Sequence, residues 1–410
     1  MRPIHMLTAF GLAVLAVLAI PAAPRAPAAA APGASAGAVA LAVDGEVTRF
    51  ELSLDRELEF RVFALTDPYR VIIDLPEIEF RIPAEAGKTG KGLVSAFRFG
   101  LFSPGRSRVV IDAAGPVAIA EPVIHEASAD RPARLVVEFS PTSHERFVRE
   151  FAVNAETQQT AAVAPPTLRE TVVPERHGTN PRPVIVIDPG HGGVDPGTVG
   201  RSGVREKDIV LEFAKDLADR LRATGSFKVV LTRTSDLFLR LDRRRAIAHE
   251  NQADLFISVH ADSIRMSGIR GATIYTVSDK ASDEEAAALA AKENRADIIA
   301  GVLLEDVSEE VSDILIELAR RDTRSRSVDF AKVLVTEMKS KVELNSNPHR
   351  SASFVVLKST DVPSVLVELG YLSNQHDEDA LLSTHWRARA STSILGALRR
   401  FFAPRLAVNQ

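Results

Sequence analysis

The chain has 410 residues and a formal net charge of −4, with 45% hydrophobic and 25% charged residues. This balance is typical of a globular protein with two domains, and it gives no support to nucleic-acid binding, which usually needs a basic excess. The sequence contains no cysteine, which excludes disulfides, thiolate metal sites, cysteine nucleophiles and a lipoprotein anchor. Any transition metal must therefore be bound by His, Asp or Glu.

The first segment predicts export from the cytoplasm. Residues 1–31 have a positive charge at Arg2, an apolar stretch over residues 7–20, and small residues at 28–30 that suit cleavage. A transmembrane anchor is the alternative, but the apolar stretch is shorter than the about 20 residues that a spanning helix needs. We therefore predict a signal peptide and a mature protein without a transmembrane anchor.

Residues 37–141 have the pattern of a small all-β domain. Apolar and polar residues alternate over residues 48–54, and apolar runs of strand length recur at 71–75, 109–112 and 135–139. Turn-forming Asp, Pro and Gly residues separate these runs. The pattern predicts a β-sandwich.

A linker is expected at residues 142–181, which carry Thr, Gln, Ala and Pro without periodicity. Strands and helices then alternate over residues 182–405. Strands are predicted at 184–187, 228–231, 255–259 and 362–368, and helices at 207–222, 241–250, 328–341 and 384–402. This alternation predicts an α/β domain with a mainly parallel central sheet and helices on both faces.

Four ionisable residues of the α/β domain lie where functional groups are expected. His191, His260 and Glu368 lie at or just beyond the ends of predicted strands, and Glu206 lies in the first turn of a helix. Because the carboxyl ends of parallel strands meet at one edge of a sheet, we expect the four side chains to converge. Two histidines and a carboxylate leave a zinc position open for water, and a second carboxylate can transfer protons. The set predicts a metal-dependent hydrolase.

Each residue alone has an ordinary structural explanation. A glycine-flanked histidine is often a loop residue, His260 could be hydrogen-bonded in the core, and Glu206 could be a helix N-terminal charge. Glu368 could pair with a buried arginine such as Arg350. Their equivalent placement favours a shared site instead.

Six motifs carry a family resemblance in one continuous order. They are Asp188-Pro-Gly-His-Gly-Gly-Val-Asp195, Gly203-Val-Arg-Glu-Lys207, Leu231-Thr-Arg-Thr234, Ser258-Val-His-Ala-Asp262, Ser353-Phe-Val-Val-Leu357 and Pro363-Ser-Val-Leu-Val-Glu-Leu-Gly-Tyr-Leu-Ser-Asn374. On these motifs, residues 182–405 resemble the zinc-dependent N-acetylmuramoyl-L-alanine amidases of bacterial cell-wall turnover. By strand pattern, residues 37–141 resemble the AMIN module that precedes such amidases in Gram-negative bacteria.

The resemblance implies a role for each member of the site. His191, Glu206 and His260 are expected to bind one Zn²⁺, and Glu368 is expected to be the catalytic glutamate. The bond cleaved would join the lactyl group of N-acetylmuramic acid to the L-alanine of the stem peptide.

The sequence does not decide the roles of two aspartates, and it allows two alternatives to the amidase function. Asp188 or Asp195 could orient a ligand histidine by a hydrogen bond. The same residues would also suit a zinc peptidase or carboxypeptidase that acts within the stem peptide. A wall-binding protein with a vestigial site is the alternative from another class, and the intact residue set argues against it.

Residues 282–325 form a segment that a minimal amidase of this type does not need. Helices are expected at 286–304 and 307–321, and the simplest interpretation is a helical hairpin packed on the sheet. The arrangement resembles that of septal, activator-dependent amidases, in which a helix here covers the active site and an acidic residue occupies the open zinc position.

Glu293 is our candidate for this acidic residue, with Glu305, Glu309 and Glu310 as alternatives. Release of such a helix needs a partner that binds the open and closed states with different affinity. The resemblance implies a periplasmic LytM-type activator, peptidoglycan as the substrate, a location in the periplasm, and a role in cell separation.

Overall fold

The computed structural model describes residues 33–128, 131–150, 182–264, 268–302 and 314–407. The predicted signal peptide lies outside the described residues, as do most of the predicted linker and the acidic candidates Glu305, Glu309 and Glu310. Within the described ranges, no helix combines the length and apolar character that crossing a bilayer requires.

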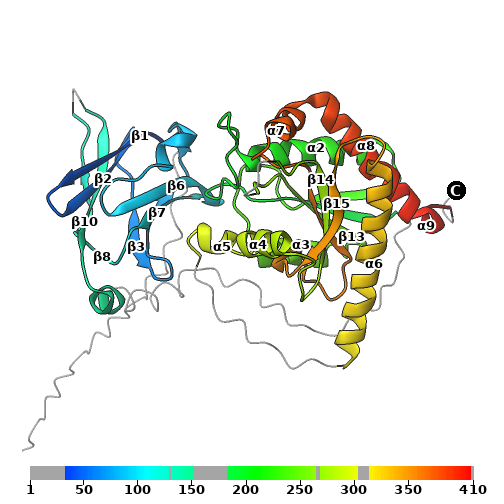
Figure 1. Cartoon of the computed structure of the whole chain (residues 1–410). Helices are drawn as coiled ribbons and strands as arrows, with labels where there is room; N and C mark the ends of the chain where they lie inside the picture. Colours follow the sequence, from blue (N-terminus) through cyan, green and yellow to red (C-terminus); the bar gives the residue numbers. More distant parts are fainter. Residues whose placement is uncertain (1–32, 129–130, 151–181, 265–267, 303–313, 408–410) are drawn as a thin grey trace, which may run out of the picture.

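The first domain is a sandwich of two β-sheets (Figure 1). The strands of the first sheet are β1 (Ser35–Asp44), β2 (Val47–Leu54), β5 (Glu79–Phe80), β8 (Val117–Ile119), β9 (Val123–His125) and β10 (Ala133–Pro141). Those of the second sheet are β3 (Arg61–Leu65), β4 (Arg70–Pro76), β6 (Val94–Ser103) and β7 (Arg106–Ala113). The orders are β5–β1–β2–β10–β8, with β9 paired to β10, and β3–β4–β7–β6. The predicted all-β sandwich is confirmed.

The second sheet of the sandwich is buried on both faces. Val71 and Ile73 of β4 point into the sandwich core, whereas Ile72 packs with Val194 and Phe238 of the second domain. Successive side chains of a strand point to opposite faces. The outer face of this sheet is therefore a contact surface between the two domains.

The chain returns to the sandwich core after its last strand. Residues 144–150 are helical, and Phe147 is fully buried in the core. Its ring meets that of Tyr69 edge-on, with the centroids 5.1 Å apart. Phe147 thus closes one end of the sandwich.

The second domain is built on one six-stranded sheet. Its strands are β11 (Val184–Pro189), β12 (Lys228–Leu231), β13 (Leu255–His260), β14 (Ala272–Val277), β15 (Leu344–Ala352) and β16 (Ser364–Glu368), in the order β12–β11–β13–β16–β14–β15. The first four strands of this order are parallel, and β14 is antiparallel to β16 but parallel to β15.

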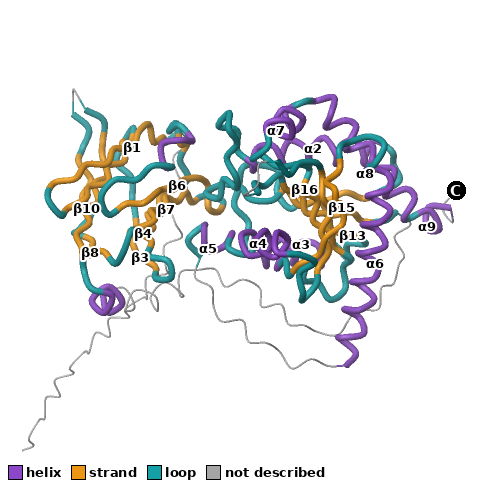
Figure 2. Tube along the Cα trace, in the orientation of Figure 1, coloured by secondary structure: helices purple, strands orange, loops and turns teal. Residues whose placement is uncertain are grey.

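Helices cover both faces of this sheet (Figure 2). They are α2 (Glu206–Ala223), α3 (Leu241–Glu250), α4 (Glu284–Glu293), α5 (Ala296–Ile299), α6 (Ile314–Met338), α7 (Gln375–Leu382), α8 (Thr384–Phe401) and α9 (Ala403–Ala407). Ile185 and Ile187 pack with α2, α6 and α8, whereas Val186 packs on the opposite face with α3 and α4. The predicted mainly parallel sheet with helices on both faces is confirmed.

Several elements differ from the sequence-based expectations, and helix α7 was not predicted. Helix α6 is continuous over Ile314–Met338, where two separate helices were expected, because no Gly or Pro interrupts it. The helix expected at 286–304 is broken after Glu293 into α4 and α5. Strands β14 and β15 were not predicted, and in β15 the polar sequence Leu-Asn-Ser-Asn-Pro-His-Arg hides the alternation.

Candidate active site

The four predicted residues converge at the carboxyl edge of the second sheet. His260 and Glu368 end adjacent parallel strands and are direct neighbours in register. His191 follows β11, and Glu206 opens α2. All four are buried. The strand ends therefore bring these side chains together as the sequence led us to expect.

Glu206 lies between the two imidazole rings. Its Oε1 is 3.1 Å from His191 Nε2 and 3.3 Å from His260 Nδ1. The carboxylate is held in place by main-chain donors, because Oε1 accepts a hydrogen bond from Ala261 N and Oε2 accepts one from Thr198 N, each at 2.9 Å. The orientation of Glu206 is thus set by the backbone.

Tight backbone packing allows the rings to approach each other. His191 has a φ of +56°, a left-handed conformation that is uncommon for a residue with a side chain. A Cβ at the neighbouring Gly190 would lie 2.4 Å from the ring of His260. Only glycine fits there, so the loop after β11 can lie directly against the second histidine.

The two candidate aspartates have different hydrogen-bond partners. Asp195 Oδ2 is 2.9 Å from His191 Nδ1, so it fixes the ring with Nε2 directed at Glu206. Asp188 instead accepts hydrogen bonds from the hydroxyls of Thr232 and Ser258 and forms a buried ion pair with Arg244. Asp195 orients a histidine, whereas Asp188 stabilises the end of β11.

Buried, unpaired ring nitrogens indicate a metal site. Among the described residues, His191 Nε2 and His260 Nδ1 are buried and have no hydrogen-bond partner, and leaving such atoms unpaired is costly. Both atoms face the same carboxylate oxygen of Glu206. Two imidazole nitrogens and one carboxylate oxygen form a ligand set that zinc prefers.

The charges around these nitrogens favour a cation. Burial lowers the pKa of His191, but the carboxylates of Glu206 and Asp195 outweigh it and raise that pKa well above its usual value. Burial raises the pKa of Glu206, but His191 outweighs this effect and lowers it well below the usual value. The carboxylates thus make the centre strongly attractive to positive charge.

Glu368 lies beside this centre with one free oxygen. Its Oε2 accepts a hydrogen bond from Asp262 N at 2.9 Å, and its Oε1 has no hydrogen-bond partner among the described residues. Burial, together with the charges of Asp262 and Glu206, raises the pKa of Glu368 well above its usual value. A buried carboxyl group with one free oxygen is suited to proton transfer. The alternative pairing with Arg350 is wrong, because Arg350 binds Asp283 and Glu285.

Glu293 of α4 covers the two histidines. Its Oε2 lies 3.2 Å from His260 Nδ1 and 3.6 Å from His191 Nε2, and the three residues form a group that could hold a metal ion. Burial raises the pKa of Glu293 to about 7. Glu293 therefore lies against the same two nitrogens as Glu206.

Both domains of the chain match known families. Residues 185–400 match the family profile described as N-acetylmuramoyl-L-alanine amidase, and residues 39–139 match the AMIN domain. The chain belongs to the N-acetylmuramoyl-L-alanine amidases. The family resemblance noted in the sequence is confirmed for both domains.

Curated relatives cover most of this amidase. An N-acetylmuramoyl-L-alanine amidase AmiC from Escherichia coli O6:H1 is 30% identical over 370 residues, which are 87% of this chain and 87% of that protein. AmiC from Neisseria meningitidis serogroup B is 29% identical over 368 residues, 86% of each chain. AmiA from Escherichia coli K12 is 38% identical over 220 residues, 53% of this chain and 76% of its own.

The amidase also has site residues that sequence reasoning did not assign. Lys292, next to Glu293, forms an ion pair with Asp262 and donates a hydrogen bond to Thr198 Oγ1 at 2.8 Å. Burial lowers the pKa of Lys292, but Asp262 and Glu206 outweigh it and raise that pKa. Asp262 lies two residues beyond His260 in a family motif, and this position could have identified Asp262 as a site residue.

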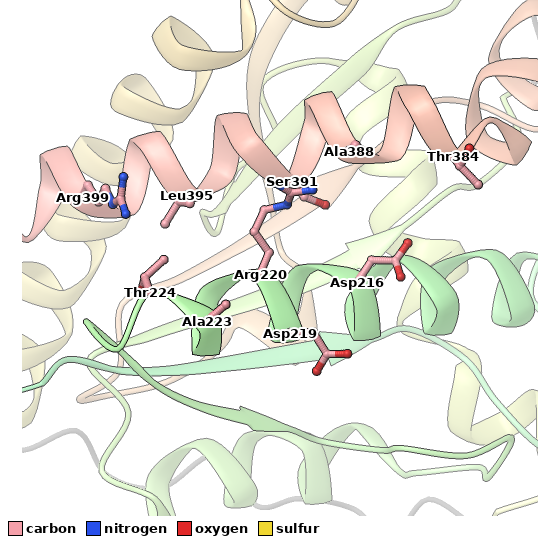
Figure 3. A pocket seen from close by; sticks show the side chains of 10 residues that line it. All are labelled: Asp216, Asp219, Arg220, Ala223, Thr224, Thr384, Ala388, Ser391, Leu395 and Arg399. Atoms are coloured by element: carbon pink, nitrogen blue, oxygen red, sulfur yellow. The ribbon is translucent and has the colours of Figure 1, made fainter.

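A second, more open groove lies away from this centre, between α2 and α8 (Figure 3). Its lining includes Asp216, Asp219, Arg220 and Arg399, and no histidine. The groove lacks the metal-binding donor set that the strand ends provide. The buried pair of histidines lies instead at the strand ends.

Proposed function

We propose that this amidase hydrolyses the bond between N-acetylmuramic acid and L-alanine in peptidoglycan, with one Zn²⁺ held by His191, Glu206 and His260. The observation that carries the proposal is the pair of buried, unpaired ring nitrogens facing one carboxylate oxygen, with Glu368 on the adjacent strand. When bound, zinc supplies a Lewis acid that lowers the pKa of water and polarises the amide carbonyl.

The protein's own groups would move the proton and fix the geometry. Glu368 accepts a proton from the attacking water at Oε1 and delivers it to the departing amine of L-alanine. The hydrogen bond from Asp262 N to Oε2 keeps Oε1 directed at the reacting bond. Asp195 holds the ring of His191 so that Nε2 faces the metal position.

The enzyme is autoinhibited in this proposal. The contacts of Glu293 with both ring nitrogens would fill the position that water and substrate need. Opening then requires α4 to leave, and an activator must bind the open state more tightly than the closed one. A periplasmic protein of the LytM type is the partner that we propose for this step.

We propose that the enzyme acts at the cell wall. The predicted signal peptide over residues 1–31 would export it to the periplasm. The AMIN domain would hold it on peptidoglycan or on a protein of the division machinery. These properties support a role in cell separation.

The function is tested with purified, zinc-loaded full-length protein carrying Glu293→Ala, so that the active site is open. We expect mass spectrometry of digested peptidoglycan to show peptides with a free L-alanine amino terminus and glycan without peptide. The same protein with Glu368→Gln added is the matched control and should release neither product. Cleavage inside the stem peptide would instead establish a peptidase.

A further inference from the structure

Three arginines of the AMIN domain bind the segment that follows the covering helix. Arg70 lies on β4, Arg98 on β6 and Arg108 on β7. Their guanidinium groups donate hydrogen bonds to four consecutive main-chain carbonyls: Arg70 to Ile298, Arg98 to Ile299 at 2.7 Å, and Arg108 to Ala300 at 3.2 Å and Gly301 at 2.9 Å. In the tube view, α5 lies at the edge of the second domain that is nearest to these strands (Figure 2).

These carbonyls are available because α5 ends there. The last carbonyls of a helix have no partner within the helix. Gly301 has a φ of +71°, and Gly301 N and Val302 N bond back to the carbonyls of Ile298 and Asp297, each at 2.9 Å, which terminates the helix. The arginines supply charged donors to the carbonyl oxygens of Ile299, Ala300 and Gly301, and Arg70 adds a second donor to that of Ile298.

Contacts within the AMIN domain fix the orientation of two of these guanidinium groups. Both carboxylate oxygens of Asp74 accept hydrogen bonds from Arg108, at 2.6 and 2.8 Å, and Asp112 binds Arg98 in the same manner. The guanidinium of Arg108 also stacks 3.5 Å from the ring centroid of Phe102. Such preorganised groups lose little conformational entropy when the segment binds.

The buried arginine side chains of this surface require hydrogen-bond acceptors. Arg70 and Arg108 are almost completely buried, and burial together with the neighbouring Arg98 lowers the pKa of Arg70 to about 10. Asp112 and Asp74 pair with Arg98 and Arg108, whereas Arg70 donates hydrogen bonds to the main-chain carbonyls of Pro68 and Ile298. Buried cations without such acceptors would be strongly destabilising.

Apolar side chains also pack closely between residues 300–302 and the AMIN sheet. Ala300 and Val302 are buried among Phe63, Ile72 and other apolar side chains of the second AMIN sheet. A Cβ at Gly301 would lie 2.6 Å from Ile72 Cδ1. The segment therefore fits the sheet closely, and its backbone approaches the AMIN domain without room for a larger residue.

We propose that the outer face of the β3–β4–β7–β6 sheet is a docking surface for residues 296–302 and that it locks α4 over the active site. The inference rests on the proposed function, because α4 carries Glu293. Only Asn294 and Arg295 separate α4 from α5, so Glu293 cannot move far while α5 stays docked. The AMIN domain thus stabilises the closed state of the enzyme in addition to any targeting role.

The lock is tested with zinc-loaded full-length protein carrying Arg98→Ala. Arg98 is the least buried of the three arginines, so its removal leaves the sandwich core in place. We expect amide hydrogen exchange in residues 284–301 to become about tenfold faster, because a charge-assisted hydrogen bond is lost. Hydrolysis of peptidoglycan without an activator should rise with it. Arg134→Ala, which removes a partly buried arginine paired with Glu51 on the other sheet, is the matched control and should change neither quantity.

A second variant tests the same contact from the opposite side. Ala300→Arg leaves the AMIN domain unaltered and places a positive charge against Arg108, so it should give the same two effects. Unchanged exchange in residues 284–301 in both variants would overturn the docking surface. Faster exchange with unchanged hydrolysis would refute the claim that docking holds α4 over the active site, provided that Glu293→Ala is active in the same assay. If Glu293→Ala is itself inactive, the amidase proposal fails, while faster exchange still supports docking.

Discussion

The floor of the active site and the segment that covers it are held in different ways. The floor residues His260 and Glu368 end neighbouring parallel strands, and main-chain N–H groups fix the carboxylates of Glu206 and Glu368. The cover, α4 and α5, is attached largely through side chains. Asn294 forms hydrogen bonds with the main chain of Ser353 and Val355, and Arg350 pairs with acidic residues at the start of α4. Lys292 pairs with Asp262. Arginines of the AMIN domain bind main-chain carbonyls at the end of α5.

Under the proposed function, this difference would separate catalysis from the control of access to the active site. Catalytic groups need to be held in a fixed geometry, and a sheet edge provides it. A cover must leave without disturbing that geometry, and side-chain contacts can be broken while the backbone of the sheet stays paired. Changes in the floor should therefore alter chemistry or metal binding, whereas changes in the cover should alter only the fraction of open enzyme.

The largest effect is expected from Glu368→Gln. In a chain opened by Glu293→Ala, this change should lower hydrolysis by about 10²–10⁴-fold, because the group that transfers the proton is lost. Zinc content, measured by atomic absorption, should stay the same, since Glu368 is not among the proposed ligands. A parallel loss of zinc would contradict the division between ligands and proton carrier.

Asp195→Asn should weaken zinc binding by about 10–100-fold, measured by competition with a chelator, because the hydrogen bond that orients His191 loses its charge. Asp188→Asn is the comparison variant, since Asp188 bonds to Thr232, Ser258 and Arg244. Its main effect should be on thermal stability. Equal losses of zinc affinity in the two variants would refute the separate roles.

Glu293→Ala tests the cover directly. Hydrolysis without an activator should rise by on the order of tenfold, because the closed state loses its contacts with His191 and His260. Glu284→Ala, an exposed position on the same helix, serves as the control. If the two variants hydrolyse peptidoglycan at the same measurable rate with zinc bound, Glu293 does not block the site.

Lys292→Met should have the smallest effect of the four. The side chain of Lys292 is 41% exposed, and Asp262 keeps its hydrogen bond from Thr198 Oγ1 when the ion pair is removed. Hydrolysis without an activator should therefore rise by less than about fivefold. Adding Lys292→Met to Glu293→Ala should give little further increase, because the cover is then already open. A full additive increase would mean that Lys292 acts on the floor instead.

The second domain shows how far the sequence alone could lead. The apolar strands and amphipathic helices gave a mainly parallel sheet with helices on both faces, and their ends predicted that His191, Glu206, His260 and Glu368 would meet. This prediction works because parallel strands share one carboxyl edge, so position along each strand determines position in space. Strands β14 and β15 and helix α7 were missed, and helix α6 was predicted as two helices. In β15, polar residues hide the alternation of the strand.

Other features depended on contacts between segments that are far apart in the chain. Asp188 and Asp195 were equivalent candidates in the sequence, and only packing against Arg244 and His191 distinguished them. Nothing in the local pattern around Arg98 or Arg108 indicates that they bind carbonyls about 200 residues away. The sequence determined the sheet, its reactive edge and the residues along it, because these follow from local periodicity. The tertiary structure alone decided what covers that edge and what holds the cover, because those contacts arise when separately folded surfaces meet.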